Sequence, residues 1–420
     1  MTDPLDGQLI LVLGMARQGR ALARWLPTTG ARVLVSDSKT AEQLGVSPGD
    51  YPGVTLALGD QSEALLDGVD AVLADLGGAL HVLAHAHRPF PPALRAELLA
   101  LNEPGANELH RVALAANALA RCYAQAVVEV LRDSRLAPAD IVAIGAHGQT
   151  LRHRPGEFDG TGYTVQALNG ALLAELSGID VVADLRSRDL AAAGQGAPLV
   201  PAFHRALFAR EGETTAVLNL GGIANLTLLH ADGSTIGFDC GPANALMDHW
   251  CERHVGTAYD ASGAWAAGGT VDAGLLAAML ADPYFAKPPP KSTGRDLFNP
   301  GWLASHLGPR PVIAAQDVQS TLAELSARCA TAALLRHAPE AHALLVCGGG
   351  AFNAHLMARL AALLPGCAVQ PTDARGLPAM QVEATAFAWL AQAHCDRRPG
   401  NLPSVTGATG SRVLGARYPR

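Results

Sequence analysis

Two charged residues, Asp184 and Arg186, follow the short apolar run Val181-Val182-Ala183. A carboxylate at the end of a buried strand is partly desolvated, and burial of this kind can turn it into a general base. Arg186, two residues further on, could hold Asp184 ionised or bind an anionic substrate. The two residues could equally form a structural ion pair at a strand end, and their types alone leave both interpretations open.

A polar turn with His147 and Gln149 follows another predicted strand, in the stretch ADIVAIGAHGQT. Side chains of these two types can donate hydrogen bonds to sugar hydroxyls. A single histidine in such a turn is more often a structural residue with satisfied hydrogen bonds, so this pair alone does not define a site.

Glycine-rich turns at strand ends are a second kind of candidate, because without a Cβ the main-chain N–H groups can approach anionic oxygens. Two turns qualify, with Asn219, Gly221 and Gly222 in the first, and Gly348, Gly349 and Gly350 in the second. The second precedes a predicted helix, whose N-terminal dipole would favour an anion. Each turn alone could be a simple connection. Two such turns joined by GFDCGPANALMD indicate a nucleotide held between two related lobes.

An α/β framework is required to position these residues. Strands are predicted in GVDAVLADL, HVLAHAHRPFP, IDVVADL, TAVLNLGGIANLTLL and ALLVCGGG, and helices over 91–100 and 107–132. The second helix should bury one face formed by Leu109, Val112, Ala115, Ala116 and Leu119. Strands repeatedly end in Gly, Asn or Asp, which is typical of α/β folds with ligand sites at strand ends.

The front of the chain predicts a separate unit. Leu9 to Leu13 is a continuous apolar run, as in a strand buried on both faces, and a helix should follow from about Arg17 to Leu26. A second strand, Ala31 to Val35, leads to Asp37, and an acidic residue in that position commonly contacts a ribose. An ordinary βαβ unit with tightly packed glycines would have the same pattern.

Composition excludes several classes of protein. The chain has 420 residues, of which 49% are hydrophobic and 16% charged, which indicates a large core and argues against disorder. A net charge of −7 with no basic tract argues against a nucleic-acid partner. The seven cysteines contain no CxxC motif and the histidines are not spaced as metal ligands. With no basic leader and no apolar run of about 20 residues, we expect a cytoplasmic protein without a membrane span.

From about residue 66 to the end, the sequence resembles the anhydro-N-acetylmuramic acid kinase family. The motifs that carry the resemblance are AHGQTLRH, VVADLRSRDLAAAGQGAPLVPAFH, LNLGGIANLT, GFDCGPANALMDHW, YDASGAWAAGG, PYFAKPPPKSTGRDLFN, VCGGGAFNAHLM and RPGNLPSVTGA. The resemblance implies an actin/hexokinase-like fold of two α/β lobes, residues 67–206 and 207–420, with the C-terminal helix returning to the first lobe. It also implies ATP as the phosphoryl donor, Mg²⁺ that arrives with ATP, a homodimer, and a role in cell-wall recycling.

The resemblance also implies a role for each matching residue. Asp184 would take a proton from the water that attacks the anomeric carbon of 1,6-anhydro-N-acetylmuramic acid, and the released O6 would receive the γ-phosphoryl group of ATP. Arg186 and Glu324 would complete the catalytic set. The residues implied in ATP binding are Asp67, Gly68, Asp70, Asn219, Gly221, Gly222, Asp239, Gly241, Gly348, Gly349 and Gly350, and those implied in substrate binding are His147, Gln149 and Gln195.

Some positions depart from the family pattern. Leu185 stands in place of Phe, Ala193 in place of Gly, and QALNG in place of Q-I-G-D-G. The family opens with a strand and the phosphate turn G-T-S-x-D-G-[VI]-D, where this chain has Glu63-Ala64-Leu65-Leu66-Asp67-Gly68-Val69-Asp70. The loss of G-T-S predicts weak use of ATP. The loss of the strand would leave an unpaired sheet edge beside Val69 to Leu73.

Residues 1–66 resemble part of the N-terminal domain of UDP-N-acetylmuramoyl-alanine–glutamate ligase, in LVLGMARQGRALARWL and GVTLALGDQSEALLDGVD. They would form a partial Rossmann-like nucleotide-sugar-binding segment. The ATP loop of that ligase, G-x-x-x-x-G-K-[ST], does not occur in the sequence, so ligase activity is not expected. Two alternatives to an active kinase stay open: a catalytically dead protein that binds the muramic sugar, and a UDP-sugar sensor that uses residues 1–66.

Overall fold

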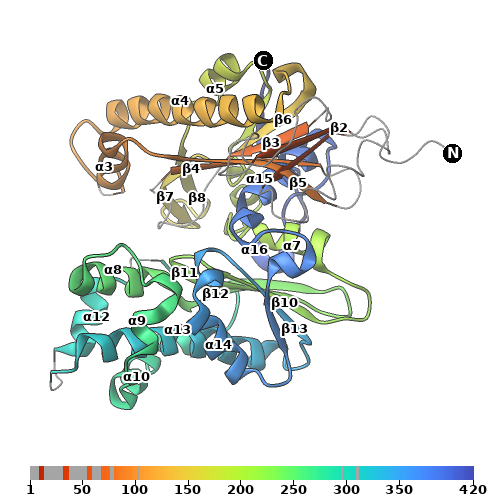
Figure 1. Ribbon diagram of the computed structural model, residues 1–420. Helices are drawn as coiled ribbons and strands as arrows, with labels where there is room; N and C mark the ends of the chain where they lie inside the picture. The colour runs from red at the N-terminus through yellow and green to blue at the C-terminus, as the bar shows by residue number, and fades with distance from the viewer. Residues whose placement is uncertain are drawn as a thin grey trace. The chain divides into compact units, whose positions relative to one another are not determined.

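The computed structural model describes residues 9–13, 32–36, 54–58, 68–75, 80–102, 104–294, 297–308 and 312–420. They form two compact units (Figure 1). The first unit contains the described residues up to Phe203 together with Gln381–Arg420, and the second contains His204–Met380. Among the helices of these described ranges, none is both long and apolar enough to cross a membrane.

The first unit is built on a six-stranded sheet with the strand order β15-β9-β6-β3-β4-β5. Strand β3 pairs antiparallel with β4, and β4 with β5. On the other side of β3, strands β6 and β9 follow in parallel, and β15 closes the edge antiparallel to β9. The strands are β3 (Val54–Leu58), β4 (Gly68–Asp75), β5 (His81–Pro89), β6 (Ile141–Ala146), β9 (Val181–Ala183) and β15 (Ala416–Tyr418), beside a separate hairpin of β7 (Gln149–Pro155) and β8 (Gly162–Ala167).

The second unit repeats this topology in a five-stranded sheet with the order β12-β11-β10-β13-β14. Its first strand, β10, again has an antiparallel pair on one side and two parallel strands on the other. The strands are β10 (Thr215–Leu220), β11 (Ile223–Leu229), β12 (Thr235–Pro242), β13 (Ala343–Cys347) and β14 (Ala368–Pro371). A strand pattern that occurs once in each of two α/β units confirms the predicted actin/hexokinase-like fold.

Helices cover the sheets within each unit. In the first unit α4 lies along one face of the sheet and α15 on the other (Figure 1). This unit contains α3 (Pro92–Ala100), α4 (Glu108–Ser134), α5 (Gly170–Ser177), α6 (Ser187–Leu190), α15 (Val382–Cys395) and α16 (Pro403–Thr406), and α7 (Val200–Phe208) spans the unit boundary. The second unit contains α8 (Asn244–Val255), α9 (Ala264–Ala267), α10 (Ala273–Leu280), α11 (Pro283–Ala286), α12 (Pro300–Leu307), α13 (Ala315–His337) and α14 (Ala354–Leu363).

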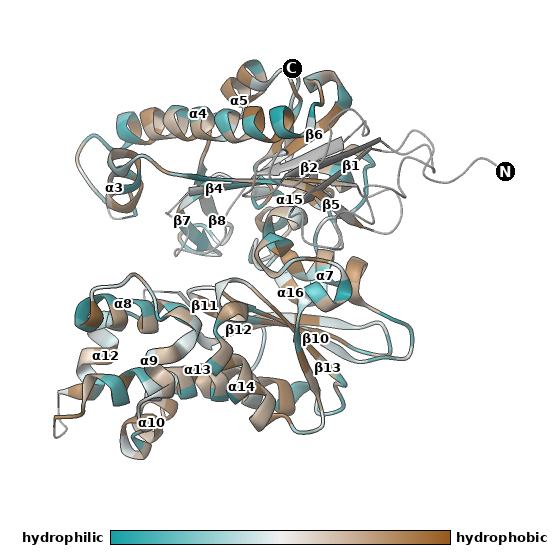
Figure 2. Cartoon of the chain, in the orientation of Figure 1, coloured by the Kyte–Doolittle hydropathy of each residue, from teal (hydrophilic) through white to brown (hydrophobic). Residues whose placement is uncertain are grey.

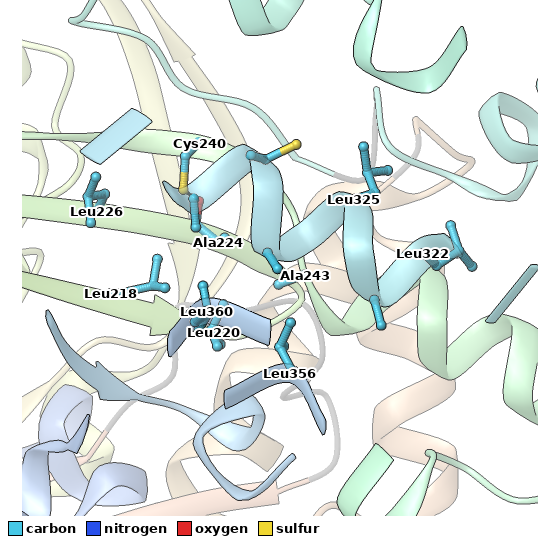
Figure 3. Close-up of a cluster of buried hydrophobic side chains, with 14 of the residues drawn as sticks. Leu218, Leu220, Ala224, Leu226, Cys240, Ala243, Leu322, Leu325, Leu356 and Leu360 are labelled. Atoms are coloured by element: carbon cyan, nitrogen blue, oxygen red, sulfur yellow. Dashed lines mark hydrogen bonds between the residues drawn. The ribbon is translucent and has the colours of Figure 1, made fainter. Parts of the chain in front are cut away.

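The core of the second unit forms between its sheet and helices α13 and α14. Leu218, Leu220 and Leu226 from the strands belong to one buried cluster with Leu325 of α13 and Leu360 of α14 (Figure 3). Because β10 and β13 are fixed by this core, the turns that follow them are held on a rigid base.

Helix α4 is amphipathic, as its mixed colouring in Figure 2 shows. Ala115 and Leu119 are buried as expected, but Leu109 is 90% exposed, so its assignment to the buried face is wrong. Leu109 lies two turns before Ala116, which is itself only partly buried at the margin of the apolar face. The periodicity therefore predicts which side of α4 is buried, but the buried side does not extend to Leu109 in the first turn of the helix.

The two strands predicted at the front of the chain are present. Strand β1 (Leu9–Leu13) pairs in parallel with β2 (Arg32–Ser36), with Leu9 opposite Arg32. The predicted helix from Arg17 to Leu26 and Asp37 lie outside the described residues.

The edge of β4 that was expected to be unpaired is in fact paired with strand β3. It comes from GVTLALGDQ, within the segment that resembles the ligase, yet it lies at the centre of the first sheet. Leu56 pairs with Leu73 of β4, and Leu58 with Ala146 of the parallel β6. The prediction of an open edge beside Val69 to Leu73 is therefore wrong, because an apolar run further upstream supplies the strand.

Candidate active site

Asp184 directly follows the last residue of β9. Because β9 is parallel to β6, Asp184 lies on the side of the sheet where the carboxyl ends of both strands are found. Its φ angle is 52°, in the left-handed region that few residues other than glycine adopt. This turn directs the side chain to solvent, so Asp184 is exposed and the expected partial burial is wrong. The Oγ of Ser187 donates a hydrogen bond to its Oδ1 at 2.5 Å, which restrains the carboxylate without covering it.

Arg186 is buried, in contrast to Asp184. Its Nε donates to Nε2 of His147 at 3.0 Å, and its Nη1 donates to the carbonyl oxygen of Gly196 at 2.7 Å. Burial lowers the pKa of Arg186 to about 10, although the negative charges of Glu383 and Asp189 partly oppose this. In the described part of the chain no ion pair joins Arg186 to Asp184. Arg186 instead links the end of β6 to the loop from Asp184 to Gly196, called the 184–196 loop below.

Asp189 is the residue of this loop that the sequence did not single out. It is fully buried, and its Oδ1 accepts hydrogen bonds from Asn401 at 2.6 Å and Thr406 at 2.8 Å. Its Oδ2 accepts from the main-chain N–H of Gly196 at 2.8 Å. A Cβ on Gly194 would lie 2.2 Å from this same Oδ2, so the loop can close around Asp189 only with glycine there. Asp189 therefore joins the 184–196 loop to the C-terminal segment that contains NLPSVT.

Ala193, where the family pattern has glycine, has a φ angle of 62°. In the left-handed conformation, steric strain from a Cβ destabilises the folded state by about 1–2 kcal/mol. Glycine avoids this strain but loses more chain entropy on folding, which costs about 0.5–1 kcal/mol. We therefore expect Ala193→Gly to raise the free energy of unfolding by about 0.5–1 kcal/mol, measured by urea denaturation.

The matched control for this change is Ala191→Gly. Ala191 is exposed, and its φ of −61° is an ordinary helical angle. Glycine there should destabilise the protein by about 0.5–1 kcal/mol. Equal effects of the two substitutions would show that the conformation of Ala193 stores no strain.

The predicted substrate residues lie in the first unit, together with Asp184. His147 is buried, and its ring lies 4.9 Å from the ring of Phe387. Gln149 is buried at the start of β7, whereas Gln195 is exposed on the 184–196 loop. The bonds of Arg186 to His147 and to Gly196 bring the end of β6 and this loop together.

The two glycine turns of the second unit follow the carboxyl ends of β10 and β13. These strands are parallel and end side by side, so the turns lie close together. A Cβ on Gly348, whose φ is 78°, would lie 2.4 Å from Oδ1 of Asn219. The main-chain N–H of Asn244, at the start of α8, donates to the carbonyl oxygen of Gly221 at 3.0 Å, and that of Ala243 donates to Gly222 at 3.0 Å. The two glycine turns and the start of α8 thus form one cluster at the ends of β10 and β13.

The sequence suggests that the Gly348–Gly350 turn leads into a helix. In the structure, a short segment separates this turn from α14. Residues Gly349–Phe352 form a single 3₁₀ turn, and α14 begins only at Ala354. Asn353 caps that helix by accepting a hydrogen bond from the N–H of Leu356. The helix dipole therefore begins beyond the glycine turn.

Asp239 and Gly241 lie on β12, and Asp239 contacts Lys291 and Thr293 of the proline-rich segment. Its Oδ2 accepts a hydrogen bond from the N–H of Thr293 at 2.9 Å. Burial raises the pKa of Asp239 to about 7, although the Thr293 hydrogen bond and the charge of Lys291 lower it in part. Gly241 packs closely against Phe285 and Cys329, without room for a side chain.

Glu324 lies on α13 in the second unit, where its side chain is 3% exposed. Arg328 donates to its Oε1 at 2.7 Å and Arg359 to its Oε2 at 2.7 Å. Burial alone would raise the pKa of Glu324, but these two arginines outweigh it and hold the pKa below its ordinary value. Both oxygens are thus occupied, and a role at the sugar stays a prediction.

Of the first three residues predicted to bind ATP, the structure describes Gly68 and Asp70. Asp67 lies outside the described residues, and Gly68 opens β4 in contact with the main chain of Arg88. Asp70 is bound by His85 at 2.6 Å and by His87 at 3.0 Å, both from β5. Burial opposes ionisation of Asp70, but the hydrogen bonds and charges of the two histidines outweigh it and lower its pKa to about 2.

Two α/β units with one shared strand topology, glycine turns at strand ends and a carboxylate at another strand end define a protein of the actin/hexokinase-like class. Comparison with known proteins specifies the family: the chain belongs to the anhydro-N-acetylmuramic acid kinase family, whose model matches residues 55–420. This match begins within β3, earlier than the motifs had indicated, and the likeness of residues 1–66 to the ligase has no further support.

Individual relatives agree with the family match. The anhydro-N-acetylmuramic acid kinase of Variovorax paradoxus (strain S110) is 60% identical over 370 residues, which cover 87% of this chain and 99% of the relative. That of Cupriavidus pinatubonensis is 58% identical, over 86% of this chain and 98% of the relative.

Solved structures are much more distant. A ROK family glucokinase from Streptomyces griseus in complex with glucose and AMPPNP is 14% identical, with a TM-score of 0.37 over 80% of this chain and 97% of its own. The activator of a dehydratase from Clostridium difficile with bound ADPNP is 11% identical, with a TM-score of 0.40 over 81% and 97% of the two chains.

Proposed function

We propose that the chain is an ATP-dependent kinase that converts 1,6-anhydro-N-acetylmuramic acid, ATP and water to N-acetylmuramic acid 6-phosphate and ADP, in cell-wall recycling. The observation that carries the proposal is 60% identity over 99% of a relative that bears this kinase name. The exposed Asp184, at the end of a strand in the first unit, supplies a carboxylate that such a reaction requires.

Asp184 takes the proton in the proposed reaction. Water attacks the anomeric carbon, the bond from that carbon to O6 breaks, and the water proton passes to the carboxylate. O6 then forms a bond to the γ-phosphorus as the bond from that phosphorus to the oxygen of ADP breaks. Ser187 keeps one carboxylate oxygen in place, and the other stays open to the attacking water.

The glycine cluster of the second unit is the part of the chain that we assign to the nucleotide. Main-chain N–H groups in glycine turns can bind anionic oxygens, because no Cβ stands in the way. We assign Asn219, Gly221, Gly222 and Gly348–Gly350 to ATP. Mg²⁺ that arrives with ATP would neutralise the charge that develops on the phosphates.

The other predicted site residues take different roles in this proposal. Arg186 acts inside the first unit, because its guanidinium group is buried and bound to His147 and Gly196. Glu324 is only 3% exposed, so the side chains around it must move if it is to contact the sugar.

A second candidate is a sugar-binding protein without kinase activity, favoured by the absence of G-T-S before Asp67. Isothermal titration with the anhydro-sugar, ATP and a UDP-sugar, together with an ADP-release assay, separates the possibilities. The kinase binds the first two and releases ADP, whereas a dead protein binds the sugar alone. Binding of the UDP-sugar alone would overturn the proposal in favour of a sensor.

A homodimer is part of the same proposal and rests on the family likeness. We expect sedimentation equilibrium at micromolar concentration to give twice the chain mass of 43.4 kDa. A monomer under these conditions would remove the dimer from the proposal and leave the kinase activity untouched.

A further inference from the structure

The C-terminal segment of the first unit lies against the 184–196 loop. The N–H of Thr409 donates a hydrogen bond to the carbonyl oxygen of Ala192 at 2.8 Å. In the opposite direction, the N–H of Gln195 donates to the carbonyl oxygen of Thr406 at 2.7 Å. The loop is therefore held at Gln195, one of the residues expected to bind the sugar.

Thr406 also binds this loop through its side chain. Its Oγ1 donates to Oδ1 of Asp189 at 2.8 Å, and both residues are fully buried. The hydroxyl has one proton, and a second possible acceptor, the carbonyl oxygen of Leu402, lies further away at 3.3 Å. The main chain and the side chain of Thr406 thus contact two different parts of the same loop.

Asp189 connects the Thr406 side chain back to Gln195. Its other oxygen, Oδ2, accepts a hydrogen bond at 2.8 Å from the N–H of Gly196, the residue after Gln195. The peptide groups before and after Gln195 are therefore both hydrogen-bonded, while Gln195 itself is exposed. A fixed main chain preorganises an exposed amide for a ligand, since the ordering cost is met before binding.

Thr406 itself lies on a packed base. It is the last residue of α16, and the nearby Leu402 and Val405 are buried in an apolar cluster with Ala202 of α7. Trp389 of α15 packs against the same cluster. Apolar packing thus fixes α16 to two other helices, so Thr406 can hold the loop in one position.

We propose that Thr406 is a positioning residue that holds Gln195 in place for the sugar, directly through its carbonyl oxygen and indirectly through Asp189. This inference rests on the proposed function, because it takes Gln195 to contact the sugar and Thr406 to act only through it. A purely structural role would change stability without distinguishing the sugar from ATP, whereas positioning predicts a loss that is specific to the sugar.

The test is a double-mutant cycle on the full chain, with isothermal titration of the anhydro-sugar. Thr406→Val keeps the shape of the side chain but loses the hydroxyl that binds Asp189, and it should weaken sugar binding about tenfold. The Kd of ATP should change less than about twofold. In a chain that already carries Gln195→Ala, the same change should weaken sugar binding less than about twofold, because the residue that Thr406 positions is gone.

Three further variants serve as controls. Thr406→Ser keeps the hydroxyl and should bind the sugar within about twofold of the unmodified chain. Thr385→Val is the matched control, because Thr385 is equally buried but its hydroxyl donates to the carbonyl oxygen of Gln381, one helical turn earlier, at 2.6 Å. It should leave both dissociation constants unchanged. Thr406→Ala removes the same hydroxyl and replaces the valine variant in the cycle if that protein does not fold.

The outcomes separate this inference from the proposed function. Equal losses from Thr406→Val with and without Gln195, or an equal loss from Thr385→Val, would overturn the inference. Unchanged sugar binding by Thr406→Val would overturn it too and leave the proposed kinase intact. If the unmodified chain binds no anhydro-sugar, it is the proposed function that fails, and this inference fails with it.

Discussion

Asp184→Asn is expected to lower kcat by ~10²–10⁴-fold and to change the Kd of the anhydro-sugar less than about twofold. Asparagine has nearly the shape of aspartate, and its side-chain oxygen can still accept the hydrogen bond from Ser187. It cannot take a proton from water, so only the chemical step should suffer. Transfer of ³²P from labelled ATP to the sugar measures this loss even when turnover is slow.

The matched control is Glu175→Gln, which neutralises an exposed carboxylate on α5 of the same unit. It should leave kcat unchanged. Asp189→Asn provides a contrast, because it leaves donors of Asn401, Thr406 and Gly196 facing an amide and should lower stability. An Asp184→Asn protein that keeps more than half of the parent kcat would exclude Asp184 as the base.

Much of the fold follows from local sequence. Runs such as ALLVC and TAVLNL are largely apolar and are each followed by glycine, so both strands and their turns could be predicted from the residues alone. The position of Asp184 after β9 was predictable for the same reason. Each of these features depends on residues within about ten positions of one another.

The missed features depend on contacts between distant parts of the chain. Asp189 is bound by Asn401 and Thr406, which are more than 200 residues further on, and Arg186 is bound to His147. No periodicity or motif spacing connects such residues. The exposure of Asp184 was missed for a different reason, since it results from one left-handed φ angle that changes the direction of the chain.

Strand β3 shows how a resemblance can conceal a structural role. The residues around the run VTLAL resemble the ligase, which places this run in a ligase-like segment. This run lies between β4 and β6 in the first sheet and pairs with both strands. Since the family match begins at residue 55, inside β3, this strand belongs to the kinase segment of the chain.

The phosphate turn is expected to limit the activity of this chain. The strand before the turn, β3, and the strand after it, β4, are both in place, so no strand needs to be restored. The family's G-T-S corresponds in sequence to Glu63-Ala64-Leu65, which lie outside the described residues. Thr and Ser hydroxyls could each donate to a phosphate, whereas a glutamate at this place in the sequence adds a negative charge.

Restoring the family residues by Glu63→Gly, Ala64→Thr and Leu65→Ser should therefore raise kcat/KM for ATP. Two charge-assisted hydrogen bonds contribute ~1.5–3 kcal/mol each, which corresponds to a gain of ~10²–10⁴-fold. Glu63→Gln alone removes the charge without adding either hydroxyl and should recover only a small part of that gain. A coupled ADP-release assay with the anhydro-sugar compares the three proteins. If the unmodified chain already turns over at ~1–100 s⁻¹, as ordinary kinases do, G-T-S is dispensable here and other residues bind the phosphates.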